Sequence, residues 1–184
     1  TRAACSENSA LIPVATINPQ SYFGQDGAFL KFKADGYRLV RFFPGPQKWV
    51  TNYAPLTVLA KRLEVEGLPI MVDISQPGMA SSLVDSLVSH PSSLILAGVD
   101  HRTASEAVAL MRAHARVYIE TSQLNAVGAI KTIIDAVGAD RVLYGSGAPL
   151  RPMASGLNVI KFAGLSDDQL AKVLGGNARQ LLEI

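Results

Sequence analysis

The sequence predicts an α/β fold built around a parallel sheet, because short apolar runs alternate regularly with helix-like segments along its 184 residues. Each run has about six or seven residues rich in Val, Ile, Leu or aromatic side chains, as expected of strands that are buried on both faces. The six predicted strands are Leu11–Ile17, Tyr37–Phe43, Leu68–Ile74, Leu94–Val99, Arg116–Thr121 and Arg141–Ser146. Both a doubly wound sheet and a βα-barrel satisfy this pattern.

Amphipathic stretches between the runs predict the helices. These stretches are Gln25–Asp35, Leu56–Glu66, Met79–Ser89, Thr103–His114, Leu124–Val137 and Asp167–Ile184. Three of them are followed at once by a glycine, Gly36, Gly67 or Gly138, which suits a left-handed C-cap. Ser166, followed by two aspartates, predicts the start of the last helix, because serine caps helices and carboxylates favour the positive end of the helix dipole. We find no linker, so residues 1–184 are predicted to form one domain.

Composition and charge exclude several classes of protein. Hydrophobic residues make up 48% and charged residues 17%, which excludes a disordered chain or a charged coiled coil. The 17 Lys and Arg against 15 Asp and Glu form no basic run, so we expect no nucleic-acid partner. The single cysteine, Cys5, excludes an internal disulfide framework and a multi-cysteine zinc site. No signal segment and no apolar stretch of ~18–20 residues is present, so we expect a cytoplasmic protein with no membrane partner.

Two common catalytic or binding motifs are missing from the sequence. No glycine-rich phosphate-binding fingerprint follows the early strands, and the Gly175-Gly176-Asn177 run lies inside the last predicted helix. No Gly-x-Ser-x-Gly sequence is present, so serine hydrolase chemistry of that type has no support.

The last third of the chain resembles a known family. Ala139–Pro149 (ADRVLYGSGAP) and Gly164–Ile184 (GLSDDQLAKVLGGNARQLLEI) are similar to the closing segment of the amidohydrolase superfamily. The nearest branch is the amidohydrolase-related group of TIM-barrel, metal-dependent hydrolases and decarboxylases. Five earlier segments resemble the family's third to seventh strands in order: Leu11–Pro19, Gly36–Gly45, Gly67–Asp73, His90–Ala97 and Val117–Ser122. The resemblance implies a parallel (β/α) repeat of TIM-barrel type with about six βα units.

The sequence departs from the family pattern at the positions that hold the metal. The family's first two strands, with their His-x-His motif, have no counterpart here. Asp73 stands at the strand-five ligand position, Gly98 at the strand-six histidine, and Gly147 at the strand-eight general-base aspartate. A zinc site needs about three protein ligands, and glycine supplies no side chain, so the resemblance implies a degenerate metal site. We therefore expect no cofactor. A divalent zinc or manganese ion is expected only if an atypical metal site, made of residues other than the family's usual ligands, is functional.

The size of the chain bears on how the barrel closes. An eight-stranded barrel usually takes ~250 residues, so the comparison implies an N-terminally truncated, incomplete or atypically closed barrel, or an excerpt of a longer chain. Such a barrel exposes strand edges and apolar interior surface. We therefore expect a homo-oligomer or a completing partner chain.

Candidate site residues lie at the C-terminal ends of the predicted strands, where this architecture carries its chemistry. The candidate catalytic residues are Asp73, His101 and Glu120, and the candidate substrate-binding residues are Arg41, Ser146 and Arg151. Asp73 is a remnant metal ligand, a general base, or the ion-pair partner of Arg41 or another cation. Arg41 either holds a substrate carboxylate or neutralises an interior acid. Glu120 either contacts a metal or substrate hydroxyl or makes internal hydrogen bonds.

The histidines and aromatic residues leave similar alternatives. His101 is a general acid or base, or an ordinary loop residue, whereas His90 and His114 lie towards the opposite face and are interpreted as structural. Trp49 and Tyr53, on a proline-rich loop, either wall a ligand pocket or cover apolar edges.

Two functions of different classes follow. The first is an amidohydrolase-related pseudoenzyme with a decayed metal site, acting as a binding or scaffold protein or as an incomplete subunit. The alternative is a metal-independent or atypical hydrolase, lactonase or decarboxylase that acts on a small carboxylated substrate. The alternative requires Asp73, His101 and Glu120 to converge on one site.

Overall fold

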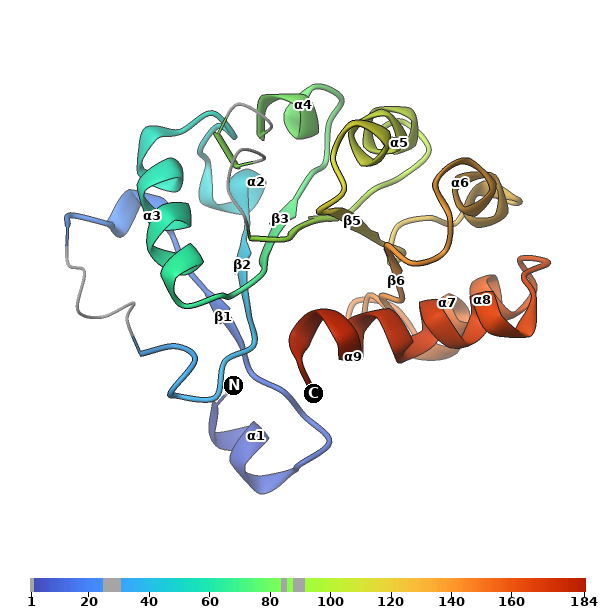
Figure 1. Cartoon of the computed structure of the whole chain (residues 1–184), viewed down its shortest axis with the longest axis horizontal. Helices are drawn as coiled ribbons and strands as arrows, with labels where there is room; N and C mark the ends of the chain where they lie inside the picture. Colours follow the sequence, from blue (N-terminus) through green and yellow to red (C-terminus); the bar gives the residue numbers. More distant parts are fainter. Residues whose placement is uncertain (1, 25–30, 84–85, 88–91) are drawn as a thin grey trace.

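The computed structural model describes residues 2–24, 31–83, 86–87 and 92–184. At its centre lies one sheet of six parallel strands whose order follows the chain, β1-β2-β3-β4-β5-β6. The strands are β1 Val14–Thr16, β2 Leu39–Phe42, β3 Ile70–Asp73, β4 Leu94–Ala97, β5 Val117–Glu120 and β6 Val142–Leu143. Each lies within a predicted run, so the predicted parallel α/β fold is confirmed. Figure 1 shows the sheet as an open arc with β1 and β6 at its two ends.

The helices that follow β2, β3, β4 and β5 cover the outside of this arc (Figure 1). The longer helices of the chain are α3 Ala54–Val65, α5 Ala104–Ala113, α6 Ala129–Val137 and α7 Met153–Lys161. The shorter ones are α1 Arg2–Glu7, α2 Pro44–Gln47, α4 Met79–Leu83, α8 Asp167–Ala171 and α9 Asn177–Leu182, with a 3-10 turn at Pro19–Ser21. Figure 1 shows α3, α4, α5 and α6 in sequence around the arc, and α7 to α9 below β6. Within the residues described, none of the helices has both the length and the apolarity that crossing a bilayer requires.

The helix predictions differ from the structure in several places. Residues 31–36 form turns in which the Tyr37 N–H donates to the Phe32 carbonyl, so the predicted helix at 25–35 is wrong there, while 25–30 lie outside the described residues. The helix predicted from Leu124 begins only at Ala129, because Gly128 has a left-handed backbone (φ 78°). α4 ends at Leu83, and the rest of its predicted range lies partly outside the described residues.

The C-terminal region also differs from the prediction. α7 was not predicted at all. The last helix does start at Ser166, whose hydroxyl accepts from the Gln169 N–H in a capping box. It is then broken by a kink at Gly175, whose backbone (φ 177°, ψ −25°) is not helical, within the segment Lys172–Gly176 that separates α8 from α9.

Glu106 of α5 fixes the start of α4. Its carboxylate accepts hydrogen bonds from the Gly78 N–H (2.9 Å), the Ser81 N–H (2.7 Å) and the Ser81 hydroxyl (2.5 Å). Burial alone would raise the pKa of Glu106, but these donors stabilise its charged form and lower the pKa below its ordinary value. The contact locks two successive βα units together.

The two faces of the sheet carry different side chains, because residues alternate along each strand. In β2, Val40 and Phe42 point outward into the main core beneath the helices, whereas Leu39 and Arg41 point to the inner face. The inner face has its own apolar cluster of Leu39, Ile95 and Leu143, against which Ala178, Leu181 and Leu182 pack. α9 therefore covers part of the surface that a closed barrel would enclose.

The segment before α9 is attached to β6. The Tyr144 N–H donates to the Val173 carbonyl at 3.0 Å. The buried Asn177 donates from Nδ2 to the carbonyl oxygens of Ala139 (2.7 Å) and Val142 (2.8 Å). These bonds use backbone groups at the β6 edge and fix α9 over the inner face.

Candidate functional site

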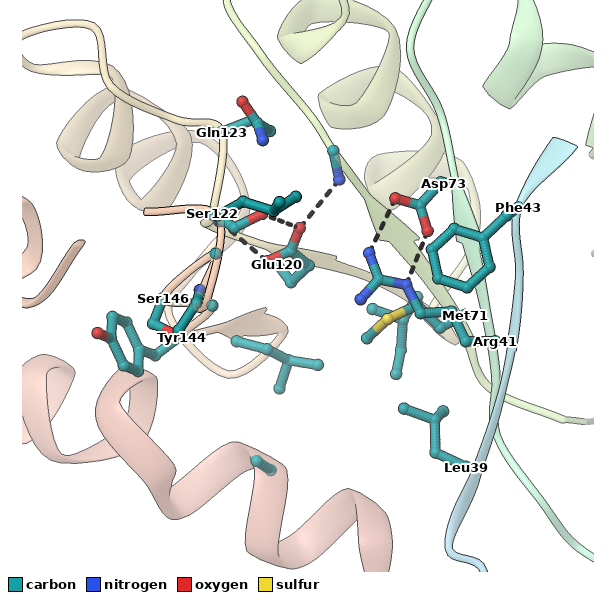
Figure 2. A pocket seen from close by; sticks show the side chains of 18 of the residues that line it. Leu39, Arg41, Phe43, Met71, Asp73, Glu120, Ser122, Gln123, Tyr144 and Ser146 are labelled. Carbon is teal, nitrogen blue, oxygen red and sulfur yellow. Dashed lines mark hydrogen bonds and ion pairs between the residues drawn. The ribbon is translucent and has the colours of Figure 1, made fainter. Parts of the chain in front are cut away.

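A cavity of about 670 Å³ opens on the inner face of the sheet, at the C-terminal ends of the strands. Its apolar wall includes Leu39, Met71, Ile95, Leu143 and Leu181, the last of these from α9. Its charged lining residues are Arg41, Asp73 and Glu120, which stand at or near the ends of β2, β3 and β5 (Figure 2). The cavity is therefore apolar on one side and charged at the strand ends.

Arg41 and Asp73 form a bidentate ion pair. Arg41 Nε donates to Asp73 Oδ2 at 2.7 Å, and Arg41 Nη2 donates to Asp73 Oδ1 at 2.8 Å. The guanidinium also lies 4.7 Å from the centre of the Phe43 ring. Burial lowers the pKa of Arg41, but the hydrogen bond to Asp73 and the charges of Asp73 and Glu120 outweigh burial and raise it. Both oxygens of Asp73 are thus engaged by a cation, as the ion-pair interpretation of its sequence position expected.

Glu120 is 6% exposed and makes three internal hydrogen bonds. Its Oε1 accepts from the Gly98 N–H (2.9 Å) and the Ser122 hydroxyl (2.6 Å), and its Oε2 accepts from the Ser122 N–H (2.9 Å). All three donors are neutral. Figure 2 shows the Glu120 carboxylate bonded on the Ser122 side of the cavity, while the Arg41 guanidinium turns to Asp73.

Two glycines make this arrangement possible. A β-carbon on Gly145 would overlap Oε2 of Glu120, so the carboxylate occupies the space that a side chain at position 145 would need. Gly98 has φ +75°, and a β-carbon there would lie 2.9 Å from the Ile74 carbonyl oxygen. Position 98 therefore has neither the backbone conformation nor the space for the histidine that the family pattern places there.

The other candidate residues lie at or beyond the rim. Ser146 lines the cavity, and its hydroxyl accepts from the Ala148 N–H at 3.2 Å. Arg151 donates to Gln123 Oε1 (2.6 Å) and to the Ser122 carbonyl (3.5 Å). It therefore holds two residues that line the cavity but is not itself among the described lining residues. His101 is exposed in the turn after β4 and is not among the described residues that line the cavity. Of the three candidate catalytic residues, the cavity brings together Asp73 and Glu120.

The remaining aromatic and histidine residues lie elsewhere. Trp49 is buried in the main core, stacks on Tyr53 and meets Phe42 edge-on. His114 ends α5, where its carbonyl accepts from Arg141, whereas His90 lies outside the described residues.

Sequence reasoning missed two parts of the site. The Gly98 N–H that holds Glu120 is a backbone donor, which leaves no mark in a sequence. Leu181 lines the cavity because α9, which follows the kink at Gly175, packs on the inner-face cluster. The amphipathic pattern of the last helix does not specify which surface it covers.

The residues present do not fit the divalent metal that the resemblance implies. Across residues 2–24, 31–83, 86–87 and 92–184, no three His, Cys, Asp or Glu side chains are grouped so as to hold a metal. Asp73 is held by Arg41 through both oxygens, and positions 98 and 147 are glycines. The usual set of about three protein ligands is therefore not assembled by these residues.

The chain matches one family of known proteins by sequence. The sequence model of the amidohydrolase family matches residues 30–184. No curated protein matches the chain by sequence.

Several solved structures share the fold. 2,6-Dihydroxybenzoate decarboxylase from Rhizobium is 14% identical over 99% of this chain and 74% of its own, with a TM-score of 0.77. An uncharacterised TIM-barrel protein from Bordetella bronchiseptica is 18% identical over 99% of this chain and 70% of its own, with a TM-score of 0.76. 5-Carboxyvanillate decarboxylase from Novosphingobium aromaticivorans is 13% identical over 100% of this chain and 67% of its own, with a TM-score of 0.74. That structure is complexed with manganese and 4-hydroxy-3-methoxy-5-nitrobenzoic acid. The fold is therefore of TIM-barrel type, and the doubly wound alternative is set aside.

Proposed function

We propose, from the premise that this chain belongs to the amidohydrolase family, that it binds a small organic molecule in the inner-face cavity without a metal site of the family's usual kind. The observation that carries the proposal is the ion pair between Arg41 and Asp73, because it occupies both oxygens of the aligned ligand position. The close approach of Gly98 to the Ile74 carbonyl supports it, since a histidine cannot be placed there without moving the strand end. The protein is then a pseudoenzyme that acts by binding.

The size and lining of the cavity support a small molecule as the ligand. About 670 Å³ falls within the range of roughly 300–1,000 Å³ typical of small-molecule sites. The carboxylate of the ligand expected from the sequence would have to approach Arg41, two nitrogens of which already donate to Asp73. Catalysis on such a molecule without a metal is the alternative. It requires Asp73, His101 and Glu120 to converge, and the cavity holds Asp73 and Glu120 without His101, so binding is the better supported of the two.

Metal retention tests the proposal directly. Purified protein is loaded with zinc or manganese, desalted and analysed for metal, and we expect less than ~0.1 ion per chain, since about three suitable ligands are not assembled. Retention of about one ion per chain, lost in Asp73→Asn and kept in the exposed control Asp135→Asn, would overturn the decayed-site proposal. Turnover of a carboxylated aromatic compound by the desalted protein would instead favour the catalytic alternative.

Association is a second proposal for this protein. Among the described strands, β1 pairs with β2 alone, and such an edge can accept another strand. A second copy or a completing chain is therefore proposed to cover it. Light scattering during size-exclusion chromatography tests self-association, and a monomer mass over a hundredfold range of loading concentration would overturn it.

A further inference from the structure

Glu120 is a buried charge without a cation of its own. The three groups that donate to its carboxylate are the Gly98 N–H, the Ser122 N–H and the Ser122 hydroxyl, and none carries charge. Buried carboxylates in proteins are usually paired with a cation or a metal, because the charged form is costly to desolvate. The described residues give this carboxylate hydrogen bonds but no direct ion pair.

The other charged groups of the cavity do not supply the missing cation. Arg41 is attracted to Glu120 through space, but two of its nitrogens donate to Asp73, with which it forms a neutral pair. Counting the described lining residues, one guanidinium stands against two carboxylates. An anion entering the cavity would therefore meet net negative charge, whereas a cation would relieve it.

The Glu120 carboxylate still has capacity to accept a hydrogen bond. A carboxylate offers about four acceptor positions, and the described contacts use three, two at Oε1 and one at Oε2. Oε2 packs against the bare Cα of Gly145, and because position 145 has no β-carbon, Glu120 keeps its place in the cavity lining. An ammonium group bound in the cavity could therefore donate an N–H to the negatively charged Glu120 carboxylate.

The rest of the cavity specifies the body of the ligand. Leu39, Met71 and Ile95 from neighbouring strands and Leu181 from α9 form an apolar wall, and the Phe43 ring stands beside Arg41. An apolar or aromatic group buries surface against this wall and gains roughly 25 cal/mol per Å² of apolar area removed from water. The charged end and the apolar wall belong to one cavity.

We propose that the ligand is an amine with an apolar or aromatic body, whose ammonium group is held by Glu120 while its body packs against the inner-face cluster and α9. The proposal rests on the small-molecule function proposed above and names its ligand class. A carboxylate on the same molecule would lie beside Arg41, so an aromatic amino acid belongs to this class and a simple carboxylic acid does not.

The test compares three probes of matched shape, phenethylamine, 3-phenylpropionate and 2-phenylethanol, by isothermal titration calorimetry up to about 1 mM. We expect phenethylamine to bind at least about tenfold more tightly than either of the others, because it alone carries the cation. An acid or alcohol that binds as well as the amine would overturn this inference and leave the small-molecule function standing. Failure of all three probes, and of phenylalanine, would count against both.

Variants test the role of Glu120. Glu120→Gln keeps the shape and removes the charge, so we expect it to weaken phenethylamine binding at least about tenfold. Ser122→Ala removes one hydroxyl donor and keeps the charge, so we expect the amine to bind at least as tightly, and the exposed Asp140→Asn serves as a control. Unchanged binding in a folded Glu120→Gln variant would overturn the inference. Where Glu120→Gln does not fold, the ranking of the probes on the unmodified protein decides.

Discussion

Replacing Gly98 by alanine tests why the strand-six position cannot carry a side chain. The residue has φ +75°, and an added β-carbon would lie 2.9 Å from the backbone oxygen of Ile74, which follows β3. Neither obstacle yields easily, because the Ile74 N–H is itself bound to the Ala97 carbonyl at 2.8 Å. The substitution forces two neighbouring strand ends apart.

The expected loss of unfolding free energy has two parts. A left-handed backbone costs a non-glycine residue about 1–2 kcal/mol, and forced overpacking typically costs about 1–3 kcal/mol. A total of about 3 kcal/mol corresponds to a fall in melting temperature of roughly 6–12 °C for a chain of this length. Urea unfolding followed by circular dichroism measures the loss directly.

Gly164 provides the matched control. Its φ is +71°, but a β-carbon there meets no atom within 4 Å. Gly164→Ala should therefore show only the backbone cost of about 1 kcal/mol. Equal losses for Gly98→Ala and Gly164→Ala would refute the steric reasoning. Gly98→His, which restores the residue of the family pattern, should destabilise at least as much as Gly98→Ala and should not create metal binding.

Three further outcomes are expected. Gly145→Ala should displace the Glu120 carboxylate from its donors and cost about 1–3 kcal/mol in urea unfolding, with weaker binding of phenethylamine; full stability with intact binding would contradict the close approach. Asn177→Ala should remove the amide donor from the Val142 carbonyl, while the Ala139 carbonyl keeps the Val142 N–H, and should cost about 1–2 kcal/mol; a change below about 0.5 kcal/mol would mean that water replaces the amide. Glu106→Gln should lower stability at neutral pH. Because the folded pKa of Glu106 lies below its unfolded value of about 4.3, its contribution is complete above that value and is lost as the pH falls through the folded pKa. The unfolding free energies of the original protein and of Glu106→Gln, plotted against pH, should therefore converge in acid. A constant difference between them down to pH 2 would mean that the charge of Glu106 is not the cause of the lost stability.

The parallel sheet could be predicted because local signals specify it. Runs such as Leu94–Ala97 are apolar throughout, which identifies a strand buried on both faces. The pairing of Arg41 with Asp73 was also within reach, since both stand near the ends of neighbouring parallel strands.

Other features depend on long-range contacts that no local pattern encodes. The position of Glu120 is determined by the hydrogen bond from the Gly98 N–H and by the lack of a β-carbon at Gly145, whose place the carboxylate takes. Both are features of the backbone. The kink at Gly175 is followed at once by Asn177, whose amide binds the carbonyl oxygens of Ala139 and Val142, more than 30 residues earlier in the sequence. Side-chain type alone specifies neither arrangement.

The order of the strands implies an order of assembly. Every strand pairs with the one formed a single βα unit earlier, so the sheet can grow one unit at a time as the chain leaves the ribosome. α9 is the exception, because its residues pack against a cluster that begins with Leu39, and Glu183 pairs with Lys33 at 3.4 Å. These contacts join residues far apart in the sequence and cannot form until α9 has been synthesised. The nascent sheet thus presents its inner apolar face to solvent and chaperones until α9 docks, and the wall of the ligand cavity that Leu181 supplies is absent until then.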